Sequence, residues 1–169
     1  MLERITIFFN SERFQGRHKK KSYFEGWYYK IIDVTEKFAF AVIPAISIDS
    51  NGEKHAFIQV LDGKKLSSEY HRFEIESFHV AFGKMDVSIG NNHFSEDRLS
   101  LDLPEIKGKI LFKNTTPWPK PFHSPGIMGP YAFVPFMECY HGIVSMDHEL
   151  MGNITYNGET INFDHGRED

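Results

Sequence analysis

Hydrophobic and polar residues alternate with a period of two along most of the chain, a pattern typical of β-strands. In one such segment Leu99, Leu101 and Leu103 are separated by Ser100 and Asp102. Apolar residues do not recur at helical spacing over any long window. Strands with turn signals about every ten residues predict one antiparallel, lipocalin-like β-barrel or sandwich with little helix.

The expected strands can be placed from this alternation and from the turn residues between them. They are residues 24–32, the first half of 37–48, 54–61, 85–89, part of 93–103, 106–112, 140–146, 151–156 and 160–163. Residues 69–82 form either a strand pair or one long bent strand. Pro44 marks an edge strand, a bulge or a strand end, because proline lacks an N–H group. Asn157–Gly158 predicts a type I′ hairpin turn.

The longest departure from this pattern is residues 124–150, SPGIMGPYAFVPFMECYHGIVSMDHEL. No charged residue occurs between Lys120 and Glu138, and prolines and glycines interrupt the apolar residues. These interruptions exclude a long helix, and a transmembrane helix would need about 20 consecutive apolar residues. The stretch is therefore either a buried loop that leads into a core strand or the wall of an apolar ligand site.

The aromatic segment 24–30, FEGWYYK, is expected to place Glu25, Trp27 and Tyr29 on one face of a strand. A carboxyl group beside two aromatic rings has two explanations. Glu25 lies at a strand end in water, which is the interpretation that we favour, or an apolar environment raises its pKa.

Length and charge narrow the class of protein. The 169 residues suit one domain, and the net charge of −4 argues against a nucleic-acid partner. Cys139 is the only cysteine, so an internal disulfide is excluded, and the first residues lack the apolar core of a signal peptide. We therefore expect a cytoplasmic location. The basic run at 17–21, RHKKK, is either a solvated loop or a weak contact with an anionic membrane surface.

Candidate chemistry gathers after the uncharged stretch. Cys139 and His141 would lie about 6–7 Å apart on a strand, too far for a nucleophilic pair, and no histidine spacing suggests a metal or cofactor site. A general acid fits better: Glu138 ends the apolar run, Asp147 is the second choice, and His141 would donate or orient the proton. The alternative is an ion-pair network at a barrel rim. The residues expected to bind a ligand are Glu25, Trp27, Tyr29, Met128, Phe133, Phe136 and Tyr140.

Three segments, FEGWYYK at 24–30, the stretch at 124–150 and FDHGR at 163–167, resemble the tocopherol cyclase family in the same order. The similarity covers residues 22–167, after a lead-in at 1–21. The resemblance implies a lipocalin-like fold with two such halves in each family member. It also implies an isomerase that closes a prenylated hydroquinone to a chromanol by protonating a trisubstituted double bond.

The sequence departs from this family after FDHGR, where the family pattern continues into an acidic segment and a second half. We therefore expect a single, shortened unit whose activity depends on whether one half suffices. One hypothesis is a tocopherol-cyclase-like enzyme that binds a prenylated aromatic ligand. A second is a non-catalytic carrier of a prenyl quinone or another apolar lipid, and a third is an apolar domain that packs on a partner, including another copy of the chain.

Overall fold

The computed structural model describes residues 12–119, 126–134, 141–164 and 167–168. Over these residues the regular structure consists of antiparallel strands and three short 3₁₀ helices. The first sheet contains β1 (Tyr23–Gly26), β2 (Tyr29–Ile32), β3 (Ala39–Ile48), β4 (Lys54–Asp62) and β5 (Ser67–Glu74). The second contains β6 (Phe78–Val80), β7 (Asp86–Ile89), β8 (Asn92–Ser95), β9 (Arg98–Asp102), β10 (Ile106–Thr116), β11 (Asp147–Tyr156), β12 (Glu159–Asn162) and β13 (Arg167–Glu168).

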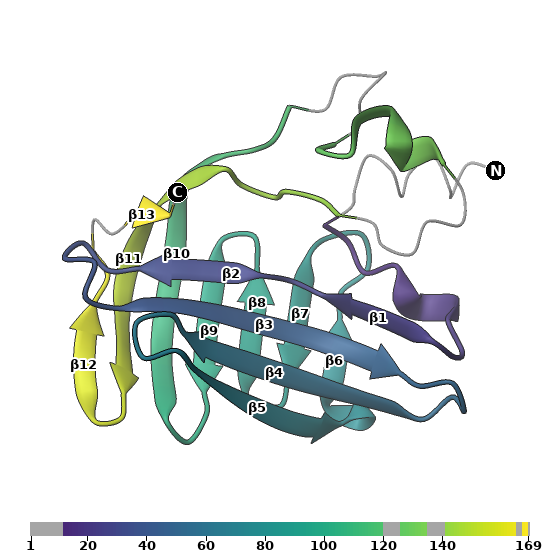
Figure 1. Cartoon of the computed structure of the whole chain (residues 1–169), viewed down its shortest axis with the longest axis horizontal. Coiled ribbons are helices and arrows are strands. Elements are labelled where there is room, and N and C mark those ends of the chain that lie inside the picture. Colours follow the sequence, from purple (N-terminus) through teal and green to yellow (C-terminus); the bar gives the residue numbers. More distant parts are fainter. Residues whose placement is uncertain (1–11, 120–125, 135–140, 165–166, 169) are drawn as a thin grey trace.

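The two sheets lie face to face and do not close into a barrel, so the fold is an all-β sandwich (Figure 1). β3 pairs with β1 and β2 on one side and with β4 on the other, while the second sheet runs in the order β12-β11-β10-β9-β8-β7-β6. This arrangement confirms the predicted antiparallel all-β class. Of the two forms expected from the sequence, the described residues adopt the sandwich.

The chain passes from the first sheet to the second between β5 and β6. The 3₁₀ helix η2 (Ile75–Ser77) makes this corner, where Ser77 Oγ donates a hydrogen bond to the Glu74 carbonyl at 2.7 Å. Residues 69–82 therefore contain parts of two separate strands, β5 and β6, which belong to different sheets and do not pair with each other, so they form neither the expected strand pair nor one long bent strand.

Pro44 lies in the middle of β3, not at a strand end or a bulge as expected. The register is continuous around it, because Gly26 pairs with Ala45 and Tyr29 pairs with Val42. Trp27 N–H donates to the Pro44 carbonyl at 3.0 Å, but proline has no N–H group to return the second bond of this pair. The missing bond explains why the expected single strand 24–32 is divided into β1 and β2.

The hairpin between β11 and β12 confirms the turn predicted at Asn157–Gly158. Their φ angles are 49° and 84°, and a type I′ turn requires positive φ at both central positions. β10 and β11 approach closely at Gly152, which has a φ of 131°. A Cβ atom there would lie 2.2 Å from the Lys109 carbonyl oxygen, so only glycine fits this position.

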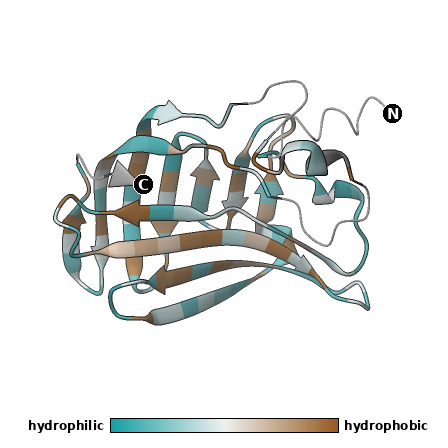
Figure 2. Cartoon of the chain, turned by 45° about the horizontal axis from the view of Figure 1, so that its top comes forward, coloured by the Kyte–Doolittle hydropathy of each residue, from teal (hydrophilic) through white to brown (hydrophobic). Residues whose placement is uncertain are grey.

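The core lies between the sheets and is formed by one face of each strand. Hydrophobic residues are concentrated along β3, whereas β5 at the sheet edge is mainly hydrophilic (Figure 2). The largest fully buried side chains are Phe40, Phe94, Phe163, Ile31, Ile58, Ile89, Leu99, Leu103, Ile106, Ile110, Leu150 and Ile154. This core fixes which side chains of β2, β10 and β11 point inward.

Candidate functional site

The connection between β10 and β11 contains the apolar stretch predicted as a site wall. It leaves the end of β10 and carries the 3₁₀ helix η3 (Gly129–Phe133) beyond the ends of the second sheet (Figure 1). Pro130 follows the first residue of η3, where its fixed φ is compatible with a helical start. Ile127, Tyr131 and Val134 are all exposed, so residues 126–134 do not form the buried loop that was one alternative.

Met128, expected to bind a ligand, and His141, expected to donate or orient a proton, are in contact in this connection. The backbone N–H of His141 lies 3.2 Å from Met128 Sδ, although the His141 side chain itself is exposed. Residues 141–146 form no strand, which corrects the expected strand over 140–146. No strand therefore places His141 and Asp147 on one face. Glu138, Phe136 and Tyr140, and the side chain of Phe133, lie outside the described residues.

β11 begins at Asp147, and its alternation separates two neighbouring titratable residues. Asp147 points outward and is exposed, whereas His148 is only 7% exposed and faces the core. The His148 ring meets the Phe112 ring edge-on, with 4.8 Å between centroids, and its Nδ1 atom lies 3.4 Å from Ser145 Oγ. Sequence reasoning did not choose His148 as a site residue, although the period of two from buried Leu150 would have indicated its direction.

Tyr29 extends this buried aromatic group across to the first sheet. Its ring stacks against Phe112 at 5.7 Å and lies 5.9 Å from Phe94. Its hydroxyl donates to the Ser95 carbonyl at 2.9 Å and lies 3.3 Å from Met85 Sδ. Burial raises the pKa of the Tyr29 hydroxyl well above its usual value, and nearby carboxylates add to the effect, so Tyr29 is a neutral donor.

We call Tyr29, Phe112 and His148 the aromatic series. It joins the two sheets near the end of β10 and the start of β11. The apolar connection between these two strands begins next to it. Aromatic faces can stabilise a cation through the ring quadrupole. A neutral phenol and an imidazole in the same group could orient a polar head, so this end of the sandwich is the best candidate site.

Trp27 lies in a neighbouring cluster that ties the lead-in segment to the core. Its indole N–H donates to the Glu12 carbonyl at 2.8 Å, and its ring lies 6.4 Å from that of Phe14. Phe14 in turn meets Phe78 edge-on at 5.4 Å. Trp27 is 8% exposed, so its own ring is almost entirely in contact with protein.

Glu25 is held by the same lead-in segment. Its carboxylate accepts hydrogen bonds from the backbone N–H groups of Gln15 and Gly16 at 3.0 Å and from the Tyr23 hydroxyl at 2.6 Å. Burial raises the pKa of Glu25 and outweighs these hydrogen bonds, which favour the charged form. Glu25 is therefore partly buried and bonded to protein donors, which differs from the position in water that we favoured. The raised pKa agrees with the alternative, but the carboxylate is bonded to polar donors and does not lie in a purely apolar environment.

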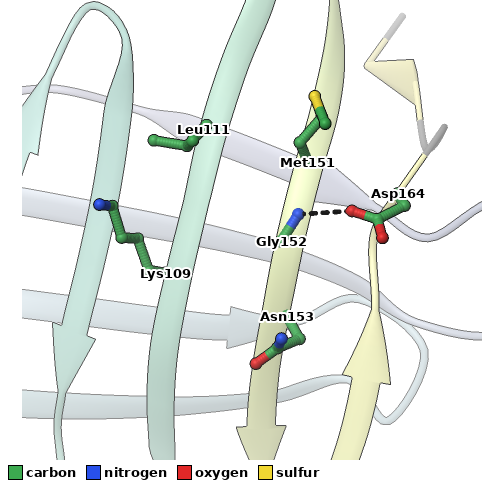
Figure 3. Close-up of a pocket in the computed structure, with 6 residues that line it drawn as sticks. All are labelled: Lys109, Leu111, Met151, Gly152, Asn153 and Asp164. Carbon is green, nitrogen blue, oxygen red and sulfur yellow. Dashed lines mark hydrogen bonds between the residues drawn. The ribbon is translucent and has the colours of Figure 1, made fainter.

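A separate hollow of about 310 Å³ opens on the outer face of β10 and β11. Figure 3 shows the residues that line it, with Asp164 Oδ1 accepting a hydrogen bond from the Gly152 N–H at 2.8 Å. They are Lys109, Leu111, Met151, Gly152, Asn153 and Asp164. Lys109 and Met151 lie on the solvent side of the sheet, opposite the core, so this hollow is not part of the aromatic series.

Two kinds of feature are absent from the described residues. The part of the chain that the structure describes holds no group of three or more histidine, cysteine, aspartate or glutamate side chains that could bind a metal ion. No helix in the same residues is long and apolar enough to cross a membrane. A comparison with family models, curated proteins and solved structures found no match to this chain.

Proposed function

We propose that the protein is a tocopherol-cyclase-like isomerase that binds a prenylated hydroquinone and closes it to a chromanol. The sequence resemblance motivates the reaction. The structural observation that supports it is the aromatic series, which lies beside a connection rich in exposed apolar side chains. Such a surface offers an apolar contact for a prenyl chain next to groups that could hold a phenolic head.

The reaction is an isomerisation, so substrate and product have the same atoms and no cofactor is needed. A proton adds to the less substituted carbon of the trisubstituted double bond, and a tertiary cation forms at the other carbon. The phenol oxygen then bonds to the cation and releases its proton, which restores the acid. Aromatic faces lower the energy of the cation, and exclusion of water prevents its capture as an alcohol.

Glu138 is the proposed proton donor, with Asp147 as the second choice and His141 as the group that orients the donor. Glu138 follows an uncharged run, whose apolar side chains would raise its carboxyl pKa and keep it protonated near neutral pH. His148 joins this proposal as an orienting group, because its ring faces Phe112 inside the sandwich.

The second candidate is a non-catalytic carrier of a prenyl quinone or a similar lipid. Two observations favour it. The partly buried carboxylate of Glu25 is occupied by donors from the protein itself, and Asp147 is exposed on the outer face of β11. A carrier needs only the apolar surface, whereas an enzyme also needs an acid that reaches the double bond.

A fluorescence titration tests the binding step common to both candidates. Trp118→Phe leaves Trp27 as the only tryptophan, next to the lead-in and the core. We expect a saturable change in Trp27 emission with a prenylated hydroquinone and none with the same head group lacking the prenyl chain. No emission change and no rise in Tm at saturating prenylated ligand would overturn the proposal. Turnover by the wild type, lost in Glu138→Gln, then separates the isomerase from the carrier.

A further inference from the structure

A basic, solvent-exposed edge adjoins one turn of the second sheet. Arg17, Lys19, Lys20 and Lys21 are all exposed, and Arg17 belongs to the 3₁₀ helix η1 (Gly16–His18). Arg17 Nη2 donates to the Ala81 carbonyl at 3.2 Å, so the start of this run is held against the β6–β7 connection. We call these four residues together with Phe82 the basic edge.

Phe82 gives this edge an apolar tip. It is 90% exposed, one of the highest values among the large hydrophobic side chains, and the Arg17 guanidinium carbon lies 5.5 Å from its ring centroid. The next residue, Gly83, has a φ of 80°, and a Cβ atom there would have no neighbour within 4 Å. Phe82 therefore stands on a turn that projects into solvent, with a cation beside it.

The basic edge carries four positive charges. None of its four cations forms an ion pair with a carboxylate of the described residues. Nearby acids have other partners: Asp86 binds Lys84 Nζ at 2.5 Å, and Glu25 is turned toward the lead-in backbone. The whole chain has a net charge of −4, so the positive charge of the basic edge is opposite in sign to that of the protein as a whole.

We propose that the basic edge docks the protein onto an anionic lipid bilayer. The cations would lie at the level of the lipid phosphates while Phe82 inserts among the upper acyl groups. The exposed phenylalanine favours a bilayer over a nucleic acid, because an interfacial aromatic side chain gains from an apolar phase. This inference stands on the edge itself and does not depend on the proposed reaction.

Vesicle co-sedimentation of the whole chain tests the docking. The vesicles contain about three parts phosphatidylcholine to one part phosphatidylglycerol, with pure phosphatidylcholine for comparison. One variant reverses the charge of Lys19, Lys20 and Lys21 to Glu, and its control reverses Lys64, Lys109 and Lys113, which are exposed elsewhere and change the net charge equally. Phe82→Ser is matched by Leu66→Ser, because Leu66 is 91% exposed in another turn.

We expect the wild type to bind the anionic vesicles, to bind less at high salt, and to leave the neutral vesicles unbound. Reversal of the three edge lysines should lower the partition coefficient about a hundredfold, and Phe82→Ser about tenfold, while both controls stay near the wild type. Equal losses in the edge and control variants, or no binding to anionic vesicles, would overturn the proposal. If heparin competes with the vesicles and Phe82→Ser leaves heparin binding unchanged, the proposal is overturned in favour of a polyanion site.

Discussion

Glu25 is predicted to fasten the lead-in segment to the sandwich, and Glu25→Ala tests this directly. The substitution leaves the N–H groups of Gln15 and Gly16 and the Tyr23 hydroxyl without their acceptor. An unsatisfied donor costs about 1–3 kcal/mol when buried. Because this site is partly open to water, which can replace some of the lost bonds, we expect a total loss of about 2–4 kcal/mol in the free energy of unfolding.

The assay is urea unfolding followed by tryptophan fluorescence, combined with hydrogen exchange of the Gln15 and Gly16 amides. Both amides should exchange faster in Glu25→Ala at low urea, since local release precedes global unfolding. The matched control is Glu76→Ala, an exposed glutamate in η2 that should change stability by no more than about 0.5 kcal/mol. If Glu25→Ala behaves like this control and leaves both amide exchange rates unchanged, the fastening role is refuted.

Three other measurements follow from the structure. Gly152→Ala should lose about 3 kcal/mol or more of stability in urea unfolding, because its Cβ would clash with the Lys109 carbonyl, whereas Gly83→Ala, which has open space, should lose only about 1 kcal/mol. Tyr29→Phe should lower stability by about 1–2 kcal/mol through its lost bond to the Ser95 carbonyl; an unchanged Tm would contradict this. Hydrogen bonds from Lys84 and Ser95 lower the pKa values of Asp86 and Asp97, so their stabilisation is present above about pH 4 and is lost as pH falls through those lowered values. The raised pKa of Glu25 acts in the opposite direction. Its contribution to the free energy of unfolding declines as pH rises through its folded pKa, and this decline should be absent in Glu25→Gln.

The period-two pattern predicted the fold class and many of the strands because alternation is a local property of the chain. The hairpin at Asn157–Gly158 was also predictable, since its positive φ angles are encoded by the two residues themselves. Pro44 was misread because its sequence position does not reveal that β3 has partners on both sides. Its missing N–H group interrupts only one of these two pairings.

The candidate site was less predictable because it depends on contacts between distant segments. The environment of Glu25 is set by Gln15 and Gly16, ten and nine positions earlier in the chain. Residues 141–146 form no strand, although the Met146 N–H donates to the Thr116 carbonyl of β10, so their apolar composition misled the prediction. The inward direction of His148 follows from where β11 begins, and pattern reasoning places element boundaries least reliably.

The most direct test of the proposed function is a single-turnover incubation with a prenylated hydroquinone without oxygen, followed by chromatography and mass spectrometry. The account predicts a product of unchanged mass with a chromanol absorption spectrum for the wild type. Glu138→Gln should retain ligand binding but lose about 10²–10⁴-fold in rate, the usual effect of removing a general acid. Recovery of only the starting hydroquinone from wild-type protein saturated with this ligand would contradict the proposed isomerase activity and favour the non-catalytic carrier.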